Sequence, residues 1–263
     1  MNVGKRSAEL DRRLLMEPIL ETTRLTKRFG ALQAVVDVNL KVHPGTIHSV
    51  IGPNGAGKTT LFNVLTGFLP PSSGRICFQG KEITGFPAHK ISRLGISRSF
   101  QITSIFPELS VRENIRIAMQ SRTPMSYRFL SALSPEDNLE ERSRQVLVRI
   151  GLQDKGDLPA RNLSHGEKRI LDIGIGLSTQ PRLLLLDEPA SGLVGDEIVR
   201  VTRLIRDIST QMTVILVEHN IDVVLSISDR ISVLSYGKVL AEGNPEEIQR
   251  NPAVQEVYLG GTC

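Results

Sequence analysis

Gly52-Pro-Asn-Gly-Ala-Gly-Lys-Thr-Thr60 is the most informative stretch of this 263-residue chain, because its glycines, lysine and threonines have the spacing of a phosphate-binding loop. It follows the apolar run Ile47–Ile51, which predicts a strand, and it leads into a predicted helix at Lys58–Gly67. Glycines let the backbone fold tightly round a phosphate chain, and the helix adds its positive N-terminal end. A chance match is the alternative, but the flanking strand and helix argue against it.

The residue types within this loop predict separate tasks. Lys58 would reach the outer phosphates as a point charge, and the Thr59 hydroxyl would be a ligand of Mg²⁺. The predicted cofactors are therefore ATP and Mg²⁺. The residues expected to hold the nucleotide are Gly52, Pro53, Asn54, Gly55, Ala56, Gly57, Lys58, Thr59 and Thr60.

Two adjacent carboxylates end a second strand-like segment, Leu183-Leu-Leu-Leu-Asp187-Glu188-Pro189. Ligands of a parallel sheet bind at the carboxyl ends of its strands, so both acids are expected beside the phosphates. Neighbouring side chains of an extended segment point apart. We therefore expect Asp187 to serve the metal and Glu188 to face the attacking water. The alternative is an acidic turn without a catalytic role.

Two further polar residues follow predicted strands. His219 comes directly after Thr213–Val217, where it would hydrogen-bond the terminal phosphate and help to position the water. An isolated histidine would more simply be a capping or surface residue. Gln101 follows the strand-like run Ile96–Phe100. There it would touch Mg²⁺ or water and join the nucleotide site to a partner.

A capping box begins another predicted helix, because Ser164 is followed three residues later by Glu167. That structural role is sufficient in itself. The same helix N-terminus can also present the Ser164 hydroxyl and backbone N–H groups to a phosphate. One site cannot easily use two loops so far apart in one subunit. We therefore expect Ser164, His165, Gly166 and Glu167 to complete the site of a second subunit.

Strand and helix signals alternate along most of the chain, which predicts an α/β fold. The apolar run Arg182–Leu186 indicates a strand buried on both faces of a parallel sheet. Helical signals dominate from about Ser110 to Leu158, and we expect residues 100–160 to be a helical insertion. We expect residues 1–17 to be a mobile tail, without the apolar region of a secretory signal, and residues 18–263 to be one ATPase domain. Further predicted strands are Ile19–Leu25, Ala34–Val42, Arg75–Gln79 and a hairpin of Arg230–Ser235 with Val239–Ala241, and further predicted helices are Asp196–Thr210 and Asn220–Ser228.

The composition limits the classes of protein to consider. Hydrophobic residues make up 40% and charged residues 23%, as in ordinary globular proteins. Aromatic residues are only 4%, which argues against a surface that stacks single-stranded nucleic acid. The net charge of +4 fits either a mildly basic protein or a basic surface for ATP or anionic lipid. Cys77 and Cys263 show no metal spacing, and no apolar run approaches the roughly 18 residues of a membrane-spanning helix.

Together and in this order, the motifs resemble those of the ATP-binding subunits of ABC transporters, over roughly Ile19–Leu259. The resemblance implies a P-loop NTPase of the ABC ATPase type, with a mainly parallel core sheet, an N-terminal antiparallel β subdomain and an inserted helical subdomain. It also implies a head-to-tail dimer, with two ATP molecules between the phosphate loop of one subunit and the signature loop Ser164–Glu167 of the other. Phe29 would stack on adenine, Gln101 would sense the membrane subunit, and the histidine after the strand would be the switch.

Several stretches look like one branch of that family, the subunits of importers for branched-chain amino acids and related solutes such as urea. This resemblance implies two transmembrane permease subunits, a second ATPase subunit in a homo- or heterodimer, and a solute-binding protein outside the membrane. It implies a peripheral position at the cytoplasmic face of the inner membrane, and no nucleic-acid partner. The stretches are Ser99–Ile102, Ile105–Asn114, Val217–Asn220 and Val257–Gly260.

Two positions depart from the family pattern. The signature commonly reads Leu-Ser-Gly-Gly-Gln, and here His165 and Glu167 replace a glycine and the glutamine. The loop after Pro189 commonly carries Asp or Asn after a leucine, whereas Val194 follows Leu193 here. Loss of that polar contact between subunits leads to the hypothesis that this is the less active of two unequal sites.

Two other functions share parts of this motif set. A soluble ABC-type ATPase that acts on ribosomes or DNA is the main alternative. Such proteins usually carry two cassettes or a long coiled coil, and this chain has one cassette and no heptad run. A GTPase would need a base-reading Asn-Lys-x-Asp, which the sequence lacks. We therefore expect an ATP-hydrolysing subunit that drives a membrane importer.

Overall fold

The computed structural model describes residues 10, 12–99, 105–121 and 135–259. Gln101 and the first residues of the predicted insertion lie outside this part of the chain. Within the predicted tail 1–17, Arg13 donates a hydrogen bond to the carbonyl oxygen of Gly45. The domain boundary after residue 17 stays a prediction.

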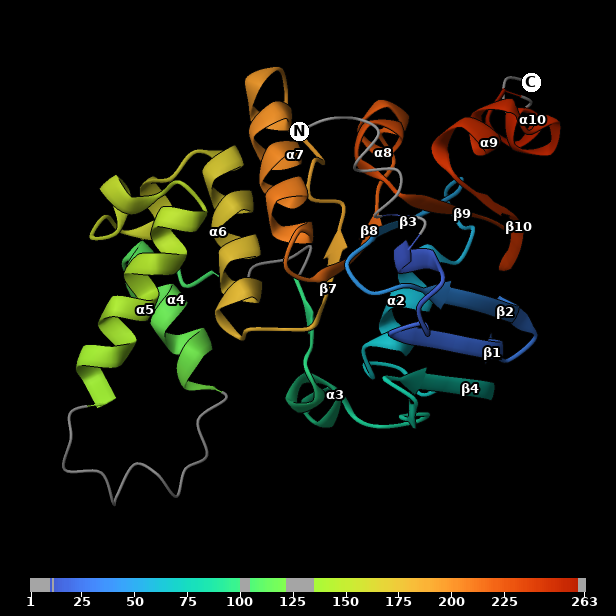
Figure 1. The fold of residues 1–263 in the computed structure, drawn as a ribbon, viewed down its shortest axis with the longest axis horizontal. Coiled ribbons are helices and arrows are strands. Elements are labelled where there is room, and N and C mark those ends of the chain that lie inside the picture. The colour runs from blue at the N-terminus through green and yellow to red at the C-terminus, as the bar shows by residue number, and fades with distance from the viewer. Residues whose placement is uncertain (1–9, 11, 100–104, 122–134, 260–263) are drawn as a thin grey trace.

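Two β-sheets frame the molecule (Figure 1). A four-stranded antiparallel sheet has the order β2-β1-β4-β5, and a six-stranded sheet has the order β10-β9-β3-β8-β7-β6. Neighbours in the six-stranded sheet are parallel, except β10 with β9. The expected N-terminal antiparallel sheet and mainly parallel core sheet are therefore confirmed. The strands are β1 (Leu20–Phe29), β2 (Leu32–Val42), β3 (Ile47–Ile51), β4 (Ser73–Phe78), β5 (Lys81–Glu82), β6 (Ile96–Arg98), β7 (Leu183–Asp187), β8 (Thr213–Val217), β9 (Arg230–Ser235) and β10 (Lys238–Gly243).

Helices α6, α7 and α8 lie along the six-stranded sheet, while α4 and α5 stand beside α6, on the side away from the antiparallel sheet (Figure 1). The described residues between 105 and 162 thus contain helices and no strand of either sheet. The helices are α2 (Lys58–Leu65), α3 (Ala88–Leu94), α4 (Val111–Gln120), α5 (Pro135–Arg149), α6 (His165–Ser178), α7 (Asp196–Ser209), α8 (Ile221–Ile227), α9 (Pro245–Arg250) and α10 (Pro252–Leu259), with short 3-10 turns at Gln153–Lys155 and Ala160–Asn162.

Some predicted boundaries are wrong, each for a local reason. Helix α2 ends at Leu65 instead of Gly67, because Gly67 has a φ of 73°, which no right-handed helix can include. Strand β1 runs on to Phe29 instead of Leu25, since its pairing with β2 continues to the hairpin turn. The sequence analysis makes no prediction for α3, β5, α9 or α10.

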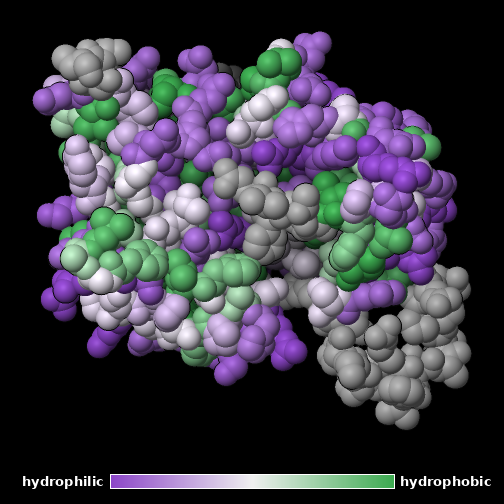
Figure 2. All heavy atoms as spheres, turned by 180° about the vertical axis from the view of Figure 1, so that it is seen from behind, coloured by the Kyte–Doolittle hydropathy of each residue, from purple (hydrophilic) through white to green (hydrophobic). Residues whose placement is uncertain are grey.

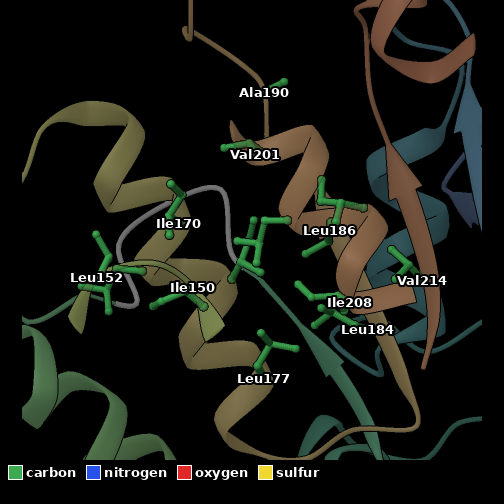
Figure 3. Packing of buried hydrophobic residues seen from close by; sticks show 14 of the residues in the cluster. Ile150, Leu152, Ile170, Leu177, Leu184, Leu186, Ala190, Val201, Ile208 and Val214 are labelled. Atoms are coloured by element: carbon green, nitrogen blue, oxygen red, sulfur yellow. The ribbon is translucent and has the colours of Figure 1, made fainter. Parts of the chain in front are cut away.

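Strand β7 connects two hydrophobic cores. Its residues Leu184 and Leu186 belong to a cluster that includes side chains of α5, α6 and α7 (Figure 3), while Leu183 and Leu185 belong to a cluster with α2 and the antiparallel sheet. All four side chains are fully buried. The prediction of a strand buried on both faces is confirmed. Helix α6 packs on β7, and α4 and α5 pack on α6 within the same core, so the helical insertion is linked through α6 to the strand that leads to the two predicted acids.

The outer surface is mostly polar. Figure 2 shows hydrophilic side chains over most of one face, with hydrophobic residues gathered in separate patches. Among the residues that the structure describes, no helix has the combination of length and apolar composition that a membrane crossing requires.

Candidate nucleotide site

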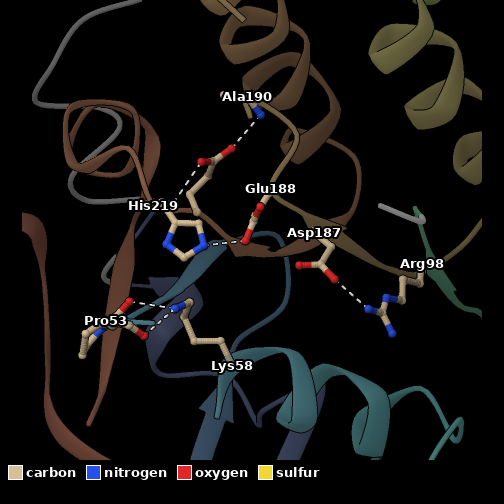
Figure 4. Close-up of polar contacts among 9 residues, drawn as sticks. Pro53, Lys58, Arg98, Asp187, Glu188, Ala190 and His219 are labelled. Atoms are coloured by element: carbon tan, nitrogen blue, oxygen red, sulfur yellow. Dashed lines mark hydrogen bonds and ion pairs between the residues drawn. The ribbon is translucent and has the colours of Figure 1, made fainter. Parts of the chain in front are cut away.

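The loop between β3 and α2 closes round the Lys58 side chain, which is buried. Lys58 Nζ donates hydrogen bonds to the carbonyl oxygens of Gly52, at 2.7 Å, and Pro53, at 2.9 Å (Figure 4). Burial lowers the pKa of Lys58, and the nearby carboxylates of Glu188 and Asp187 oppose that shift. The loop therefore holds an ammonium group close to both predicted acids.

The backbone of this loop leaves no room for a larger residue at Gly52 or Gly57. Gly57 has a φ of 101°, and a Cβ atom there would lie 2.2 Å from the carbonyl oxygen of Ala34. Gly57 is also the N-cap of α2, and no side chain caps this helix. The first N–H groups of α2 are thus not satisfied by a cap, which is the arrangement of a helix N-terminus that binds an anion. Thr59, in the first turn of α2, is exposed.

Asp187 is held at the end of β7 by a buried ion pair. Its Oδ2 atom lies 2.6 Å from Arg98 Nη2, and the two side chains are 1% and 9% exposed. The other carboxylate oxygen, Oδ1, is buried and has no hydrogen-bond partner among the described residues. A carboxylate oxygen in that situation, together with the Thr59 hydroxyl, is a donor set suited to Mg²⁺.

Glu188 points away from Asp187, although not for the reason that the sequence suggests. We expected an extended segment, but Glu188 has a φ of 50°, in the left-handed region. Its backbone N–H donates to the carbonyl oxygen of Val217, at 2.8 Å. The turn directs Glu188 toward His219, while Asp187 faces Arg98 (Figure 4).

His219 and Glu188 form a direct contact between the ends of β8 and β7. His219 Nε2 lies 2.5 Å from Glu188 Oε1, and the histidine side chain is 43% exposed. The carboxyl ends of β3, β7 and β8 thus bring together Lys58, Asp187, Glu188 and His219, as the rule for parallel sheets predicts. Phe29, at the end of β1, is 45% exposed, and Lys27 Nζ lies 5.1 Å from the centre of its ring.

The predicted capping box is present at the start of α6. Ser164 Oγ accepts from the Glu167 N–H at 3.2 Å, and Glu167 Oε2 accepts from the Ser164 N–H at 3.1 Å. Lys155 Nζ adds an ion pair to Glu167 Oε1 at 2.6 Å. Burial raises the pKa of Glu167, but the hydrogen bonds from Lys155 and the Ser164 backbone outweigh it and leave the pKa below its ordinary value. Glu167, which stands where the family commonly has glutamine, thus has its negative charge stabilised by Lys155 and by the hydrogen bonds of the capping box.

This signature segment is not part of the cluster round Lys58. Helix α6 lies beside α4 and α5, and α7 and β7 separate it from α2 (Figure 1). Ser164 and His165 are exposed, whereas Gly166 and Glu167 are buried. The next loop along the chain lies close to it, since a Cβ atom on Gly192 would come within 3.1 Å of His165 Nε2.

Two residues near the site have no role in the sequence analysis. The buried Glu218 accepts hydrogen bonds from the backbone N–H groups of Ala190 and His219. Tyr258 of α10 reaches the start of the phosphate-binding loop: burial raises the pKa of Tyr258 to about 12, opposed by a hydrogen bond from the Gly52 backbone. Both residues belong to stretches that resemble the importer branch, Val217–Asn220 and Val257–Gly260. Membership of those stretches was the only sign in the sequence of a role near the site. Gln101, the remaining predicted site residue, lies outside the described residues.

Comparison with known proteins places these features in a family. The sequence pattern of the ABC transporter family matches residues 35–191, and that of the branched-chain amino acid ATP-binding cassette transporters matches residues 238–262. The high-affinity branched-chain amino acid transport ATP-binding protein BraF of Pseudomonas aeruginosa is 42% identical over 255 residues, which cover 94% of this chain and 99% of BraF. The corresponding LivG protein of Escherichia coli is 41% identical over 253 residues, with the same coverage.

Solved structures agree with the sequence relatives. The ADP conformation of an ATP-binding cassette of an ABC transporter superposes with a TM-score of 0.83 at 31% identity, over 93% of this chain and all of that chain. A nucleotide-free cassette gives a TM-score of 0.82 at 32% identity, over 92% of this chain and 99% of that chain. These relatives support a transport role over the ribosome or DNA alternative. The chain therefore belongs to the ABC transporter family, as an ATP-binding and ATP-hydrolysing subunit.

Proposed function

We propose that this chain hydrolyses ATP to drive the import of branched-chain amino acids or related small polar solutes. The observation that carries the chemistry is the convergence of Lys58, Asp187, Glu188 and His219 at one edge of the sheet. The support for the solute class comes from BraF and LivG, whose names specify branched-chain amino acid transport and whose sequences align over almost their whole length.

ATP would bind with its phosphates in the loop at the N-terminus of α2. Lys58 would then exchange its hydrogen bonds to the Gly52 and Pro53 carbonyl oxygens for contacts with the outer phosphate oxygens. Thr59, Asp187 and, by resemblance, Gln101 would hold Mg²⁺, which neutralises charge on the phosphates when bound. The exposed ring of Phe29 is available to stack on adenine.

Hydrolysis would use the two side chains that now contact each other. Glu188 would orient the water and accept its proton as the water oxygen bonds to the γ-phosphorus, and ADP would leave with the electrons of the broken P–O bond. His219 would hydrogen-bond the γ-phosphate, for which it must turn from Glu188 Oε1. Its partial exposure leaves room for that rotation.

A second ATPase subunit would complete each nucleotide site. Ser164 and His165 are exposed at the start of α6, a helix that α7 and β7 separate from α2, so they are available to the ATP of a partner. Val194 is 74% exposed in the neighbouring loop, where it offers an apolar contact in place of a polar one. We retain the hypothesis that this chain forms the less active site of an unequal pair. A heterodimer that hydrolyses ATP equally at both sites would contradict it.

Two permease subunits would contact the pair from the membrane. A groove with a volume of about 330 Å³ lies between α3, β6, α4 and α6, next to Arg98. The groove thus borders both the helical insertion and Arg98, which pairs with Asp187. A permease segment bound there would be displaced when either of them moves. The chain would be peripheral at the cytoplasmic face of the inner membrane, and a solute-binding protein would act on the outside.

The test is a pull-down of the tagged chain from detergent-solubilised native membranes, followed by an ATPase assay on the eluate. We expect multi-span permease subunits to co-purify and branched-chain amino acids to bind the complex's solute-binding protein. The matched variant Glu188→Gln should capture the same partners and lose at least about 100-fold of the activity. Ribosomes or nucleic acid in place of membrane proteins would refute the transport role, and full activity of Glu188→Gln would refute the catalytic assignment.

A further inference from the structure

Glu218 is a buried carboxylate in contact with two loops. Its side chain lies at the end of β8, and the residue is 2% exposed. One oxygen, Oε1, accepts a hydrogen bond from the backbone N–H of Ala190 at 2.6 Å. The other, Oε2, accepts from the backbone N–H of His219 at 3.1 Å, and the backbone of Asn220 also donates to the carboxylate.

These bonds span the two segments that carry the reacting groups. Ala190 follows two residues after Glu188, and His219 is the next residue after Glu218. Two other contacts tie the same segments together, namely the Glu188 N–H to the Val217 carbonyl oxygen and His219 Nε2 to Glu188 Oε1. The carboxylate therefore closes a ring of hydrogen bonds in which Glu188 and His219 both lie.

The energetics favour a positioning role over simple packing. Burying a carboxylate is costly unless hydrogen bonds compensate it, so packing alone gives no reason for a glutamate at this place. Burial does raise the pKa of Glu218, against the effect of the backbone hydrogen bonds. A carboxylate also has acceptors only, which suits a place where converging backbone N–H groups need partners. Glutamine has nearly the same shape but would set its NH₂ group against one of those donors.

We propose that Glu218 is a positioning residue for ATP hydrolysis, which fixes the loop after Glu188 and the backbone of His219 in one arrangement. The inference rests on the proposed roles of Glu188 and His219. It predicts that loss of the carboxylate slows the chemical step while nucleotide binding persists. The reason is that the phosphate-binding loop joins β3 to α2, whereas Glu218 accepts hydrogen bonds from the segments that follow β7 and β8.

The experiment compares the kcat and KM of the full-length chain, within the membrane complex, for Glu218→Gln and the wild type. We expect kcat to fall about 10- to 100-fold, as for small displacements of reacting groups, and KM for ATP to change less than about threefold. Glu218→Asp, whose shorter carboxylate cannot span both loops, should show the same split. It provides the answer if Glu218→Gln fails to fold.

Asp229→Asn is the matched control, since Asp229 Oδ2 accepts from the Ile47 N–H at 2.8 Å, at the opposite end of β3 from the phosphate-binding loop. It should lower the melting temperature without the loss of kcat. A wild-type kcat in Glu218→Gln would overturn the inference. It would also be overturned if kcat fell in Glu218→Gln and in Asp229→Asn alike, in proportion to the fall in their melting temperatures. If Glu188→Gln keeps full activity, the proposed function and this inference fail together. If only Glu188→Gln is inactive, the inference alone fails.

Discussion

The buried pair of Arg98 and Asp187 offers a quantitative test of how the site is held together. The perturbation is Arg98→Met, which keeps an apolar stem against the rings of Phe62 and Phe68, whose centres lie 5.8 and 5.9 Å from the guanidinium carbon. It removes the ion pair with Asp187 and the hydrogen bond to Asn63.

The structure sets the expected magnitude. The Asp187 side chain is 1% exposed, so without Arg98 its charge would remain buried and unpaired. Removing one partner of such a pair costs about 3–5 kcal/mol of the free energy of unfolding. The double variant Arg98→Met/Asp187→Asn has no buried charge left at this position. It should recover most of that loss, which gives a coupling energy above about 2 kcal/mol.

The assay is urea unfolding of the wild type, both single variants and the double variant. Arg161 and Glu108 provide the control cycle, because they form an ion pair whose side chains are 57% and 71% exposed. Such surface pairs contribute at most about 1 kcal/mol. If the Arg98 and Asp187 cycle gives a coupling energy no larger than the control cycle, the argument that burial makes this pair structural is refuted.

Two other predictions concern buried features near the sheet. Burial lowers the pKa of His48 from 6.5 to about 4, so below pH 6.5 the unfolded chain binds a proton that the native chain does not. This group should lower the free energy of unfolding by up to about 3 kcal/mol as the pH drops from 6.5 to 4. Urea unfolding at several pH values should show this pH dependence reduced in His48→Gln. The control His89→Gln, at an exposed site, should keep the pH dependence of the wild type. Gly57→Ala would force its Cβ against the Ala34 carbonyl oxygen, so titration with a fluorescent ATP analogue should show affinity at least about 10-fold weaker. Gly80→Ala is its control, since Gly80 lies outside the phosphate-binding loop, also has a positive φ and meets no described atom within 4 Å; it should cost about 1–2 kcal/mol of stability without that loss of affinity. Equal losses of affinity for the ATP analogue in the two glycine variants would contradict the argument for Gly57. A wild-type pH dependence of the free energy of unfolding in His48→Gln would contradict the argument for His48.

The fold and much of the candidate site could be predicted where chemistry depends on local spacing. The phosphate-binding loop, the acids after β7 and the capping box at Ser164 each occupy a few consecutive residues, and the structure places the loop and the acids together because strand ends meet at one edge of a parallel sheet. The expectation for Glu188 shows the limit of such reasoning. Its orientation comes from a left-handed turn held by Val217, a residue of another strand.

The amino-acid order was enough to indicate an α/β ATPase and most of the residues that would meet ATP, since a phosphate-binding loop and a strand that ends in two acids are short-range patterns. Only the tertiary structure decided which side chains and backbone groups pair with those residues. Arg98 and Asp187 are far apart along the chain and meet because β6 and β7 pair. Glu218 meets Ala190 because β7 and β8 pair. Such contacts leave no periodic or local pattern, because strand order and burial in the folded sheet create them.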